Sequence, residues 1–257
     1  MKTFATYNIK GGVGKTATAV NLSYLAARDG YRVLLWDLDP QGAASFLFRI
    51  RPRVKGGGKA LIRGTRPVDD AIKATDFDNL DLLPADFTYR HLDLVLDAAK
   101  KPARRLGSLL APLSAEYDVI FLDCPPGISL LSESVLHAAD TLLVPLIPTT
   151  LSVRTLDQLT EFITGFNGSR PAILAFFSMI DRRKRLHREI FEQLPAQRDD
   201  VAAATIPALS LIERMSVQRA PVTAFAPRSA AARRYTELWQ EARERSGLRP
   251  PAPAGTW

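Results

Sequence analysis

The sequence predicts an α/β fold in which helices cover both faces of a mostly parallel, twisted sheet. Short apolar runs alternate with helical segments along the chain, and these runs lack the apolar/polar alternation of a half-exposed strand. At 257 residues and 46% hydrophobic content, the chain can build one large domain but has little room for a second core. Polar residues gather where the runs end, which is where open α/β sheets bind ligands.

The first predicted strand, KTFATYN at 2–8, leads into the glycine-rich stretch KGGVGKTAT at 10–18. A helix is predicted over 14–30, because apolar residues recur at helical spacing and Gly30 stops the pattern. The spaced residues are Val20, Leu22, Tyr24 and Leu25. Strand, glycine loop and helix therefore follow one another in the order that a phosphate-binding loop requires.

Further short apolar runs with polar ends are predicted to be strands of the same sheet. They occupy 31–39, 79–86, 117–126, 140–149 and 171–181. Helical stretches such as 151–166 and 183–194 separate them. We expect a single domain over 1–246 and a flexible tail over 247–257, because the tail has no periodicity.

Composition narrows the class of protein. The chain starts without a basic segment followed by an apolar run and cleavage site, and contains no uninterrupted apolar segment of membrane-spanning length, so we expect a cytoplasmic protein. Cys124 is the single cysteine, which excludes an intramolecular disulfide and a cysteine-rich metal site. We interpret Cys124 as a small buried hydrophobe rather than a reactive thiol.

Basic residues are concentrated in two parts of the chain, whose net charge is +7. The segment 49–66 holds seven Lys/Arg and no acid, and 182–257 holds 14 basic against eight acidic residues. The remainder is therefore acidic. This asymmetry indicates basic surfaces that face a polyanion, with a plain solvated loop as the alternative.

The glycine loop has the residues needed to hold a triphosphate. Gly11, Gly12 and Gly14 leave backbone N–H groups free to point at phosphate oxygens, and the helix that follows adds its positive end. Lys15 can reach the β- and γ-phosphates, and Thr16 can offer its hydroxyl to Mg²⁺. The usual pattern GxxxxGK[ST] asks for glycine at Ile9, however, and a second lysine follows that position.

Carboxylates end two of the predicted strands. Asp123 ends the apolar part of 117–126, where P-loop enzymes place the acid that holds the metal's water shell. Asp37 and Asp39 end 31–39, and one of them is placed to orient water or metal, with helix caps as the alternative. The turn at Pro125, Pro126 and Gly127 is suited to sensing the γ-phosphate or simply to ending the strand.

The motifs NIKGGVGKT, DLDPQG and DCPPG together resemble those of the ParA/MinD family of deviant Walker A P-loop ATPases. The segment from IPALSLIERM to ARRYTELWQEA resembles the ending of ParA proteins, so the resemblance covers about residues 2 to 245. It implies a P-loop NTPase fold, with ATP and Mg²⁺ as cofactors. The implied nucleotide-binding residues are Lys10, Gly11, Gly12, Val13, Gly14, Lys15, Thr16 and Ala17.

The resemblance also implies a role for each polar residue. The lysine at the position of Lys10 crosses the interface of an ATP-bound homodimer and contacts the partner's nucleotide, so it is catalytic together with Lys15. Asp39 positions the attacking water, while Thr16, Asp37 and Asp123 lie at or near Mg²⁺. Hydrolysis is then slow until a ParB-like or cargo adaptor protein stimulates it.

Within the family, the sequence favours DNA over a membrane. The ending RERSGLRPPAPAGTW does not form the amphipathic helix with which MinD-type members end. ParA-type members bind DNA non-specifically, which would make the protein nucleoid-associated. Arg183 matches a family DNA contact, but Leu211 stands where a second basic residue is expected. The candidate DNA-binding residues are Arg182, Arg183, Lys184 and Arg185, with Arg188 nearby. Arg214 and Arg219 are candidates to replace the basic residue that is missing at Leu211.

The resulting hypothesis is a ParA-type ATPase that partitions or positions a cargo. The sequence does not indicate whether the cargo is a plasmid, a chromosome region or a protein assembly. The alternatives are a MinD-like membrane-associated ATPase, a metabolic P-loop enzyme and a scaffold with an inactive loop. A nitrogenase-iron-protein-like reductase would need paired cysteines, and an ATP-dependent ligase would need a substrate pocket. The intact loop lysines and aspartates disfavour the scaffold.

Overall fold

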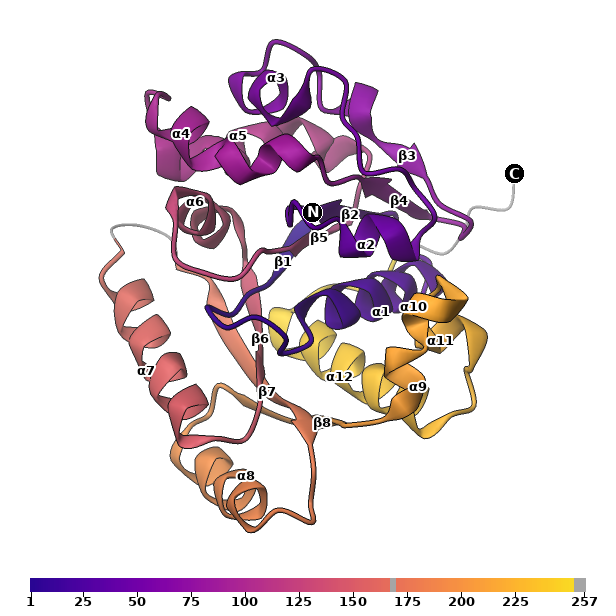
Figure 1. Cartoon of the computed structure of the whole chain (residues 1–257), viewed down its shortest axis with the longest axis vertical. Helices are drawn as coiled ribbons and strands as arrows, with labels where there is room; N and C mark the ends of the chain where they lie inside the picture. The colour runs from indigo at the N-terminus through magenta and orange to yellow at the C-terminus, as the bar shows by residue number, and fades with distance from the viewer. Residues whose placement is uncertain (167–169, 252–257) are drawn as a thin grey trace.

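The computed structural model describes residues 1–166 and 170–251, which form an eight-stranded sheet between two layers of helices (Figure 1). The strand order is β3-β4-β2-β5-β1-β6-β7-β8, with β3 antiparallel to β4 and the other pairs parallel. The strands are β1 Lys2–Thr6, β2 Val33–Asp37, β3 Lys73–Ala74, β4 Leu80–Leu83, β5 Val119–Asp123, β6 Thr141–Leu146, β7 Ala172–Ile180 and β8 Val201–Pro207. The predicted fold class is confirmed.

The helices connect these strands and vary from one turn to almost five. They are α1 Lys15–Arg28, α2 Ala43–Leu47, α3 Gly57–Arg63, α4 Leu92–Asp97, α5 Arg105–Leu110, α6 Leu130–Ala138, α7 Thr150–Thr164, α8 Arg185–Gln197, α9 Ser210–Glu213, α10 Met215–Gln218, α11 Val222–Phe225 and α12 Ala230–Ser246. Short 3₁₀ segments lie at Asp69–Ala71, Phe87–His91, Pro102–Arg104 and Ala111–Ala115.

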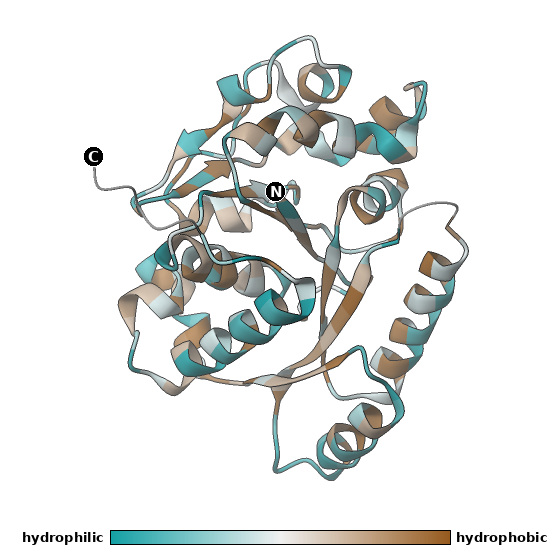
Figure 2. Ribbon diagram, turned by 180° about the vertical axis from the view of Figure 1, so that it is seen from behind, coloured by the Kyte–Doolittle hydropathy of each residue, from teal (hydrophilic) through white to brown (hydrophobic). Residues whose placement is uncertain are grey.

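Each face of the sheet has its own hydrophobic core. Along β2, Leu34 and Trp36 face α3 to α8, whereas Val33 and Leu35 face α1, α11 and α12. Successive side chains of a strand point to opposite faces, so a strand between two helical layers must be apolar throughout. Figure 2 shows the resulting hydrophobic strands and the hydrophilic outer sides of the surrounding helices.

The order of the strands places the ligand-binding edge. β1 lies between β5 and β6. The strands on its β5 side and those on its β6 side are therefore added toward opposite edges of the sheet. Such a reversal leaves a crevice at the carboxyl ends of the strands. The glycine loop follows β1, and Asp37 and Asp123 are the last residues of β2 and β5. The fold therefore gathers the sequence motifs at one edge.

Every strand predicted from the sequence is present, but β8 and the two-residue β3 were not predicted. The β8 sequence VAAATIP is dominated by alanine, which has little intrinsic preference for strands, and it forms because it pairs with β7 and packs under α12. No described helix is long and apolar enough to cross a membrane.

The division into one domain over 1–246 and a flexible tail over 247–257 stays a prediction. Gly247 adopts a left-handed conformation at the end of α12, and the Tyr31 hydroxyl donates to the Arg249 carbonyl at 2.8 Å. Residues 252–257 lie outside the described residues.

Candidate nucleotide site

The glycine loop is anchored by the residue that precedes its first turn. Asn8 is buried, and its Nδ2 donates to the carbonyl of Pro145 on β6 at 2.8 Å. Its Oδ1 accepts from the backbone N–H of Lys10 at 2.9 Å. One amide side chain thus ties the loop to the neighbouring strand and sets where the loop turns.

The loop is open on its outer side and tight at its end. A Cβ added to Gly11 or Gly12 would meet no described atom within 4 Å, which leaves room for phosphate oxygens. Gly14 has φ +97°, and a Cβ there would lie 2.9 Å from Oγ of Ser178 on β7. Only glycine adopts this conformation at little cost. It lets α1 begin close against β7.

Lys15 is held inside the curve of the loop. Its Nζ donates to the Lys10 carbonyl at 3.0 Å, and the residue is only 7% exposed. Burial lowers the pKa of Lys15, while the charges of Asp123 and Asp39 raise it. Removing an ammonium from water costs free energy unless anions surround it, so its position favours an anionic ligand in the loop.

Two carboxylates end neighbouring strands directly beneath the loop. Asp37 and Asp123 are paired in register on β2 and β5, and both are fully buried. Oδ2 of Asp37 accepts from the backbone N–H and the hydroxyl of Ser45, each at 2.7 Å. Oδ1 of Asp123 accepts from the Thr6 hydroxyl at 3.3 Å. The other oxygens, Oδ1 of Asp37 and Oδ2 of Asp123, accept no hydrogen bond from the described residues.

These unpartnered oxygens fit a bound cation. Burial raises the pKa of Asp37 to about 6 and that of Asp123 well above its usual range, and the nearby charge of Asp37 raises the pKa of Asp123 further. A divalent ion or an ammonium would relieve both penalties. The described residues contain no group of three or more His, Cys, Asp or Glu that could hold a metal alone. Mg²⁺ takes few protein ligands and completes its shell with phosphate and water.

Asp39 lies in the turn after β2, where it is half-buried. Its Oδ1 accepts from the N–H of Gln41 at 2.9 Å, and its carbonyl accepts from the N–H of Gly42 at 2.9 Å. The turn after β5 is attached to the glycine loop, because the N–H of Gly127 donates to the Ile9 carbonyl at 3.0 Å. The hydroxyl of Tyr7 also donates to the Gly127 carbonyl at 3.0 Å. The predicted turn at Pro125, Pro126 and Gly127 therefore contacts the loop directly.

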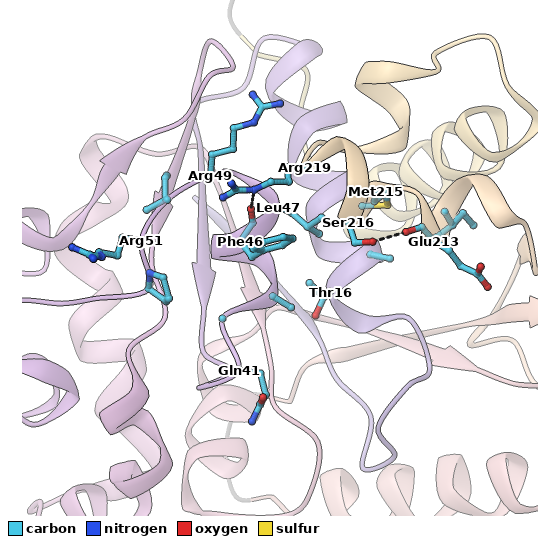
Figure 3. A pocket seen from close by; sticks show the side chains of 16 residues that line it. Thr16, Gln41, Phe46, Leu47, Arg49, Arg51, Glu213, Met215, Ser216 and Arg219 are labelled. Carbon is cyan, nitrogen blue, oxygen red and sulfur yellow. Dashed lines mark hydrogen bonds between the residues drawn. The ribbon is translucent and has the colours of Figure 1, made fainter.

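A cleft of about 730 Å³ opens beside the loop (Figure 3). It begins at Thr16 and Ala17 and runs between α2 on one side and α9 and α10 on the other. Arg219 is among its lining residues; its Nε donates to the Phe46 carbonyl at 3.0 Å, and its guanidinium lies 4.6 Å from the Phe46 ring centre. Figure 3 shows Gln41 and Thr16 at the loop end of this cleft.

The predicted basic residues 182–185 form one exposed turn between β7 and the start of α8. Arg183 donates to Asp181 through Nε and Nη2, both at 3.0 Å, and Arg185 pairs with Glu189 at 2.7 Å. Arg182 lies over the ring of Phe191 at 5.2 Å. Part of the positive charge of this turn is therefore balanced within the subunit.

The two residues proposed to replace the missing basic residue lie away from the turn 182–185. Arg214 is exposed at the junction of α9 and α10, whereas Arg219 is fixed against α2 in the cleft. Leu211 is partly buried and packs on the core formed with α1 and α12. A basic side chain there would remove that apolar contact.

Four polar residues of the site were not predicted from the sequence: Thr6, Asn8, Ser45 and Ser178. Thr6 and Ser45 donate to Asp123 and Asp37, Asn8 joins Lys10 to Pro145, and Ser178 lies where a Cβ on Gly14 would point. Asn8 lies just before the glycine loop, so its position in the sequence could have indicated that it belongs to the site. Nothing in the sequence around Ser45 or Ser178 pairs them with Asp37 or Gly14.

The comparisons with known proteins agree with this geometry. The family model described as "AAA domain" matches residues 1–175. The sporulation initiation inhibitor protein Soj of Bacillus subtilis is 32% identical over 246 residues, which are 93% of this chain and 97% of that protein. The chain belongs to the ParA/MinD family, in its Soj-like ParA branch. The chromosome partitioning protein ParA of Caulobacter vibrioides is another relative in this branch, 32% identical over 94% of this chain and 93% of its own length.

Solved structures of this ParA/MinD fold superpose over nearly the whole chain. The ATP complex of a Cyanothece McdA variant has a TM-score of 0.81 at 21% identity, covering 98% of this chain and 99% of that one. A structure titled cobyrinic acid a,c-diamide synthase from Mycobacterium smegmatis, with bound ADP and magnesium, has a TM-score of 0.78 at 26% identity. It covers 99% of this chain and 100% of that one.

The conformation of Gly14 gives a prediction about stability without nucleotide. Gly14→Ala should lower the free energy of unfolding by about 1–2 kcal/mol, because the added Cβ is strained at positive φ and presses on Ser178. Gly11→Ala is the matched control, since its Cβ enters open space and its φ is not in the left-handed region. Urea unfolding of both variants measures the difference, and equal losses would contradict the argument.

Proposed function

We propose that this protein is a ParA-type ATPase that forms an ATP-dependent sandwich dimer, binds DNA non-specifically and partitions or positions a cargo through partner-stimulated hydrolysis. The observation that carries the proposal is the buried pair Asp37 and Asp123, whose unpartnered oxygens lie beneath an open glycine loop that already holds Lys15. Burying these charged groups costs free energy unless a cation lies beside the carboxylates and an anion beside Lys15. In the Mg²⁺ complex of ATP, the metal ion is the cation and the triphosphate is the anion.

In this proposal the loop residues 11–17 hold the phosphates of the subunit's own nucleotide, and Lys10 contacts those of the partner's. The backbone N–H groups of the glycines and the first turn of α1 face the phosphate oxygens, and Lys15 neutralises the β- and γ-phosphates. Thr16, Asp37 and Asp123 hold Mg²⁺ and its water shell. When bound at these residues, Mg²⁺ would neutralise charge on the γ-phosphoryl group and on the ADP that leaves.

Lys10 acts across the dimer interface. Its backbone is fixed by Asn8 and it is half-buried, but it adjoins the exposed Gly11 and Gly12, where a second subunit can approach. A cation inserted beside the partner's phosphates stabilises charge that develops during γ-phosphoryl transfer and also holds the dimer together. Nucleotide binding and dimerisation are thereby linked.

Asp39 orients the attacking water. Unlike Asp37, it is half-exposed, and its carboxylate receives one backbone hydrogen bond, so acceptor capacity remains for a water molecule. Its turn follows β2 directly and is therefore positioned by the same strand that carries Asp37. An adaptor protein stimulates hydrolysis by completing this arrangement.

The basic turn 182–185 contacts the DNA backbone, with Arg214 and Arg219 as further candidates. Two copies in an ATP dimer double the number of phosphates neutralised, so affinity depends on dimerisation. The protein then works in the cytoplasm on the nucleoid, without a membrane.

A metabolic ATP-dependent enzyme is the second candidate, and the cleft of about 730 Å³ favours it, because that space adjoins Thr16 and could receive a small substrate. The rate of ATP hydrolysis with and without DNA distinguishes the two. Stimulation by DNA and an adaptor supports the ParA function, whereas fast turnover that needs only a small acid supports the enzyme.

Lys15→Gln should weaken ATP binding about 100-fold or more, because a buried charge-assisted contact to the phosphates is lost and no other residue replaces it. Lys10→Gln is the control. It should leave ATP affinity of the single subunit nearly unchanged while removing the ATP-dependent dimer. Titration with a fluorescent ATP analogue measures both variants, and unchanged affinity in Lys15→Gln would exclude the proposed phosphate site.

Asp39→Ala should bind ATP and dimerise, yet hydrolyse it about 100-fold more slowly, because binding rests on the loop and water orientation on the carboxylate. Size-exclusion chromatography with ATP should show a persistent dimer. Asp39→Asn keeps a side-chain acceptor for the Gln41 N–H and should show the same defect if charge is what matters. A monomer with ATP in both variants would refute the assignment.

Arg183→Glu/Arg185→Glu should lower affinity for any duplex and flatten its dependence on salt, because each lost phosphate contact reduces the slope by about one. ATP hydrolysis without DNA should barely change. DNA binding over a salt series with ATP and with ADP is the measurement. If the wild type bound DNA equally well with ATP and with ADP, the DNA site could not depend on the ATP-bound dimer.

A further inference from the structure

The proposed function leaves the basic run 49–66 unused. Within it, α3 buries Gly58, Leu61 and Ile62 and exposes Lys59 and Arg63 on its outer side. α3 packs against α4 and α5, which are joined by a second basic stretch around residues 100–105. Two stretches that are almost forty residues apart in sequence therefore meet on one surface.

A cleft of about 450 Å³ lies where they meet. Arg63, Lys100, Lys101 and Arg105 contribute to its lining, and no carboxylate does so in the described part of the chain. In the described ranges, none of these four residues forms an ion pair, in contrast to Arg183 and Arg185. Like charges held together without counter-charges disfavour the folded state unless an anion binds between them.

One of these cations is held in position. Arg105 donates from Nε to the carbonyl of Ile62 near the end of α3. Gly64 follows with φ +68°, and a Cβ there would lie 2.8 Å from Nη2 of Arg105. The close approach of the guanidinium thus depends on glycine. The other N–H groups of Arg105 remain available for an anion, because a guanidinium carries five donors.

We propose that this surface is a second phosphate-binding site, which takes the backbone of duplex nucleic acid and so deepens the proposed DNA-binding function on which it rests. Nucleic acid is favoured over a single small anion because the cations continue beyond the cleft. The same two stretches of the chain carry further exposed or half-exposed basic residues, which are Lys55, Lys59, Arg66 and Arg104. A duplex offers a matching row of phosphates, whereas a small anion would engage only the cleft.

This surface is separate from the turn 182–185. Figure 1 shows α3, α4 and α5 at one end of the long axis and α8 at the other, consistent with the sheet order that puts β4 and β7 near opposite edges. One subunit can therefore hold two stretches of duplex. Contributions from sites this far apart add nearly independently.

The test uses the full chain with ATP and a long duplex of arbitrary sequence over a salt series. The variant is Arg63→Gln/Lys100→Gln/Lys101→Gln, and the control of equal charge change is Arg228→Gln/Arg233→Gln/Arg249→Gln, all exposed arginines. We expect the cleft variant to bind about tenfold more weakly and to flatten the salt slope by about two to three, while the control changes little. Basal ATP hydrolysis should match the wild type in both. Thermal unfolding should show neither variant less stable than the wild type, and the cleft variant at or above it, because repulsion between like charges is removed.

Both triple changes are also made in the Arg183→Glu/Arg185→Glu background. The residual DNA binding of that background should be lost with the cleft changes and kept with the control changes. Cleft and control variants that bind alike would overturn the inference and leave the proposed function intact, whereas a wild type that binds no duplex would overturn both. Loss of binding to anionic lipid vesicles without any loss of DNA binding would assign the surface to a membrane and also overturn it.

Discussion

The site depends on one constraint, which is that Asp37 and Asp123 end adjacent strands in register and are both removed from water. Each has one oxygen satisfied by a neighbouring side chain and one without a partner. Two buried carboxylates side by side repel each other, so the repulsion must be offset by a bound proton or by positive charge from the surroundings. The fold supplies part of it through Lys15, which is drawn inside the glycine loop above them. Much of the remaining geometry keeps this loop over these strand ends.

Hydrogen bonds tie β2 to α2, and tie the glycine loop to β6 and to the turn after β5. Asn8 fixes it to β6, Gly127 fixes the turn after β5 to it, and Asp37 fixes the start of α2 through Ser45. α2 is in turn attached to the end of α10, where Arg219 donates to the Phe46 carbonyl. The hydrogen bonds of Asp37 and Arg219 thus link β2 through α2 to the end of α10.

Positive charge is arranged in two ways. Around the turn 182–185, arginines pair with Asp181 and Glu189, so the local field is moderate and the side chains are partly oriented. Around the cleft between α3 and α5, the cations have no such partners in the described ranges. Surface ion pairs contribute little to stability, which makes the paired arginines easy to release to phosphates. The unpaired cluster requires no such release.

The sequence by itself determined the fold class, the order of strand, glycine loop and helix, and the identity of the strand-end aspartates. These follow from local rules, because apolar runs, glycine spacing and terminal carboxylates are each visible within a few neighbouring residues. The tertiary structure alone decided which distant residues meet. It pairs Ser45 with Asp37, turns Arg219 into the cleft and joins Arg63 to Lys100. It also made a strand of the alanine-rich β8, since sheet pairing and burial under α12 outweigh weak local preference.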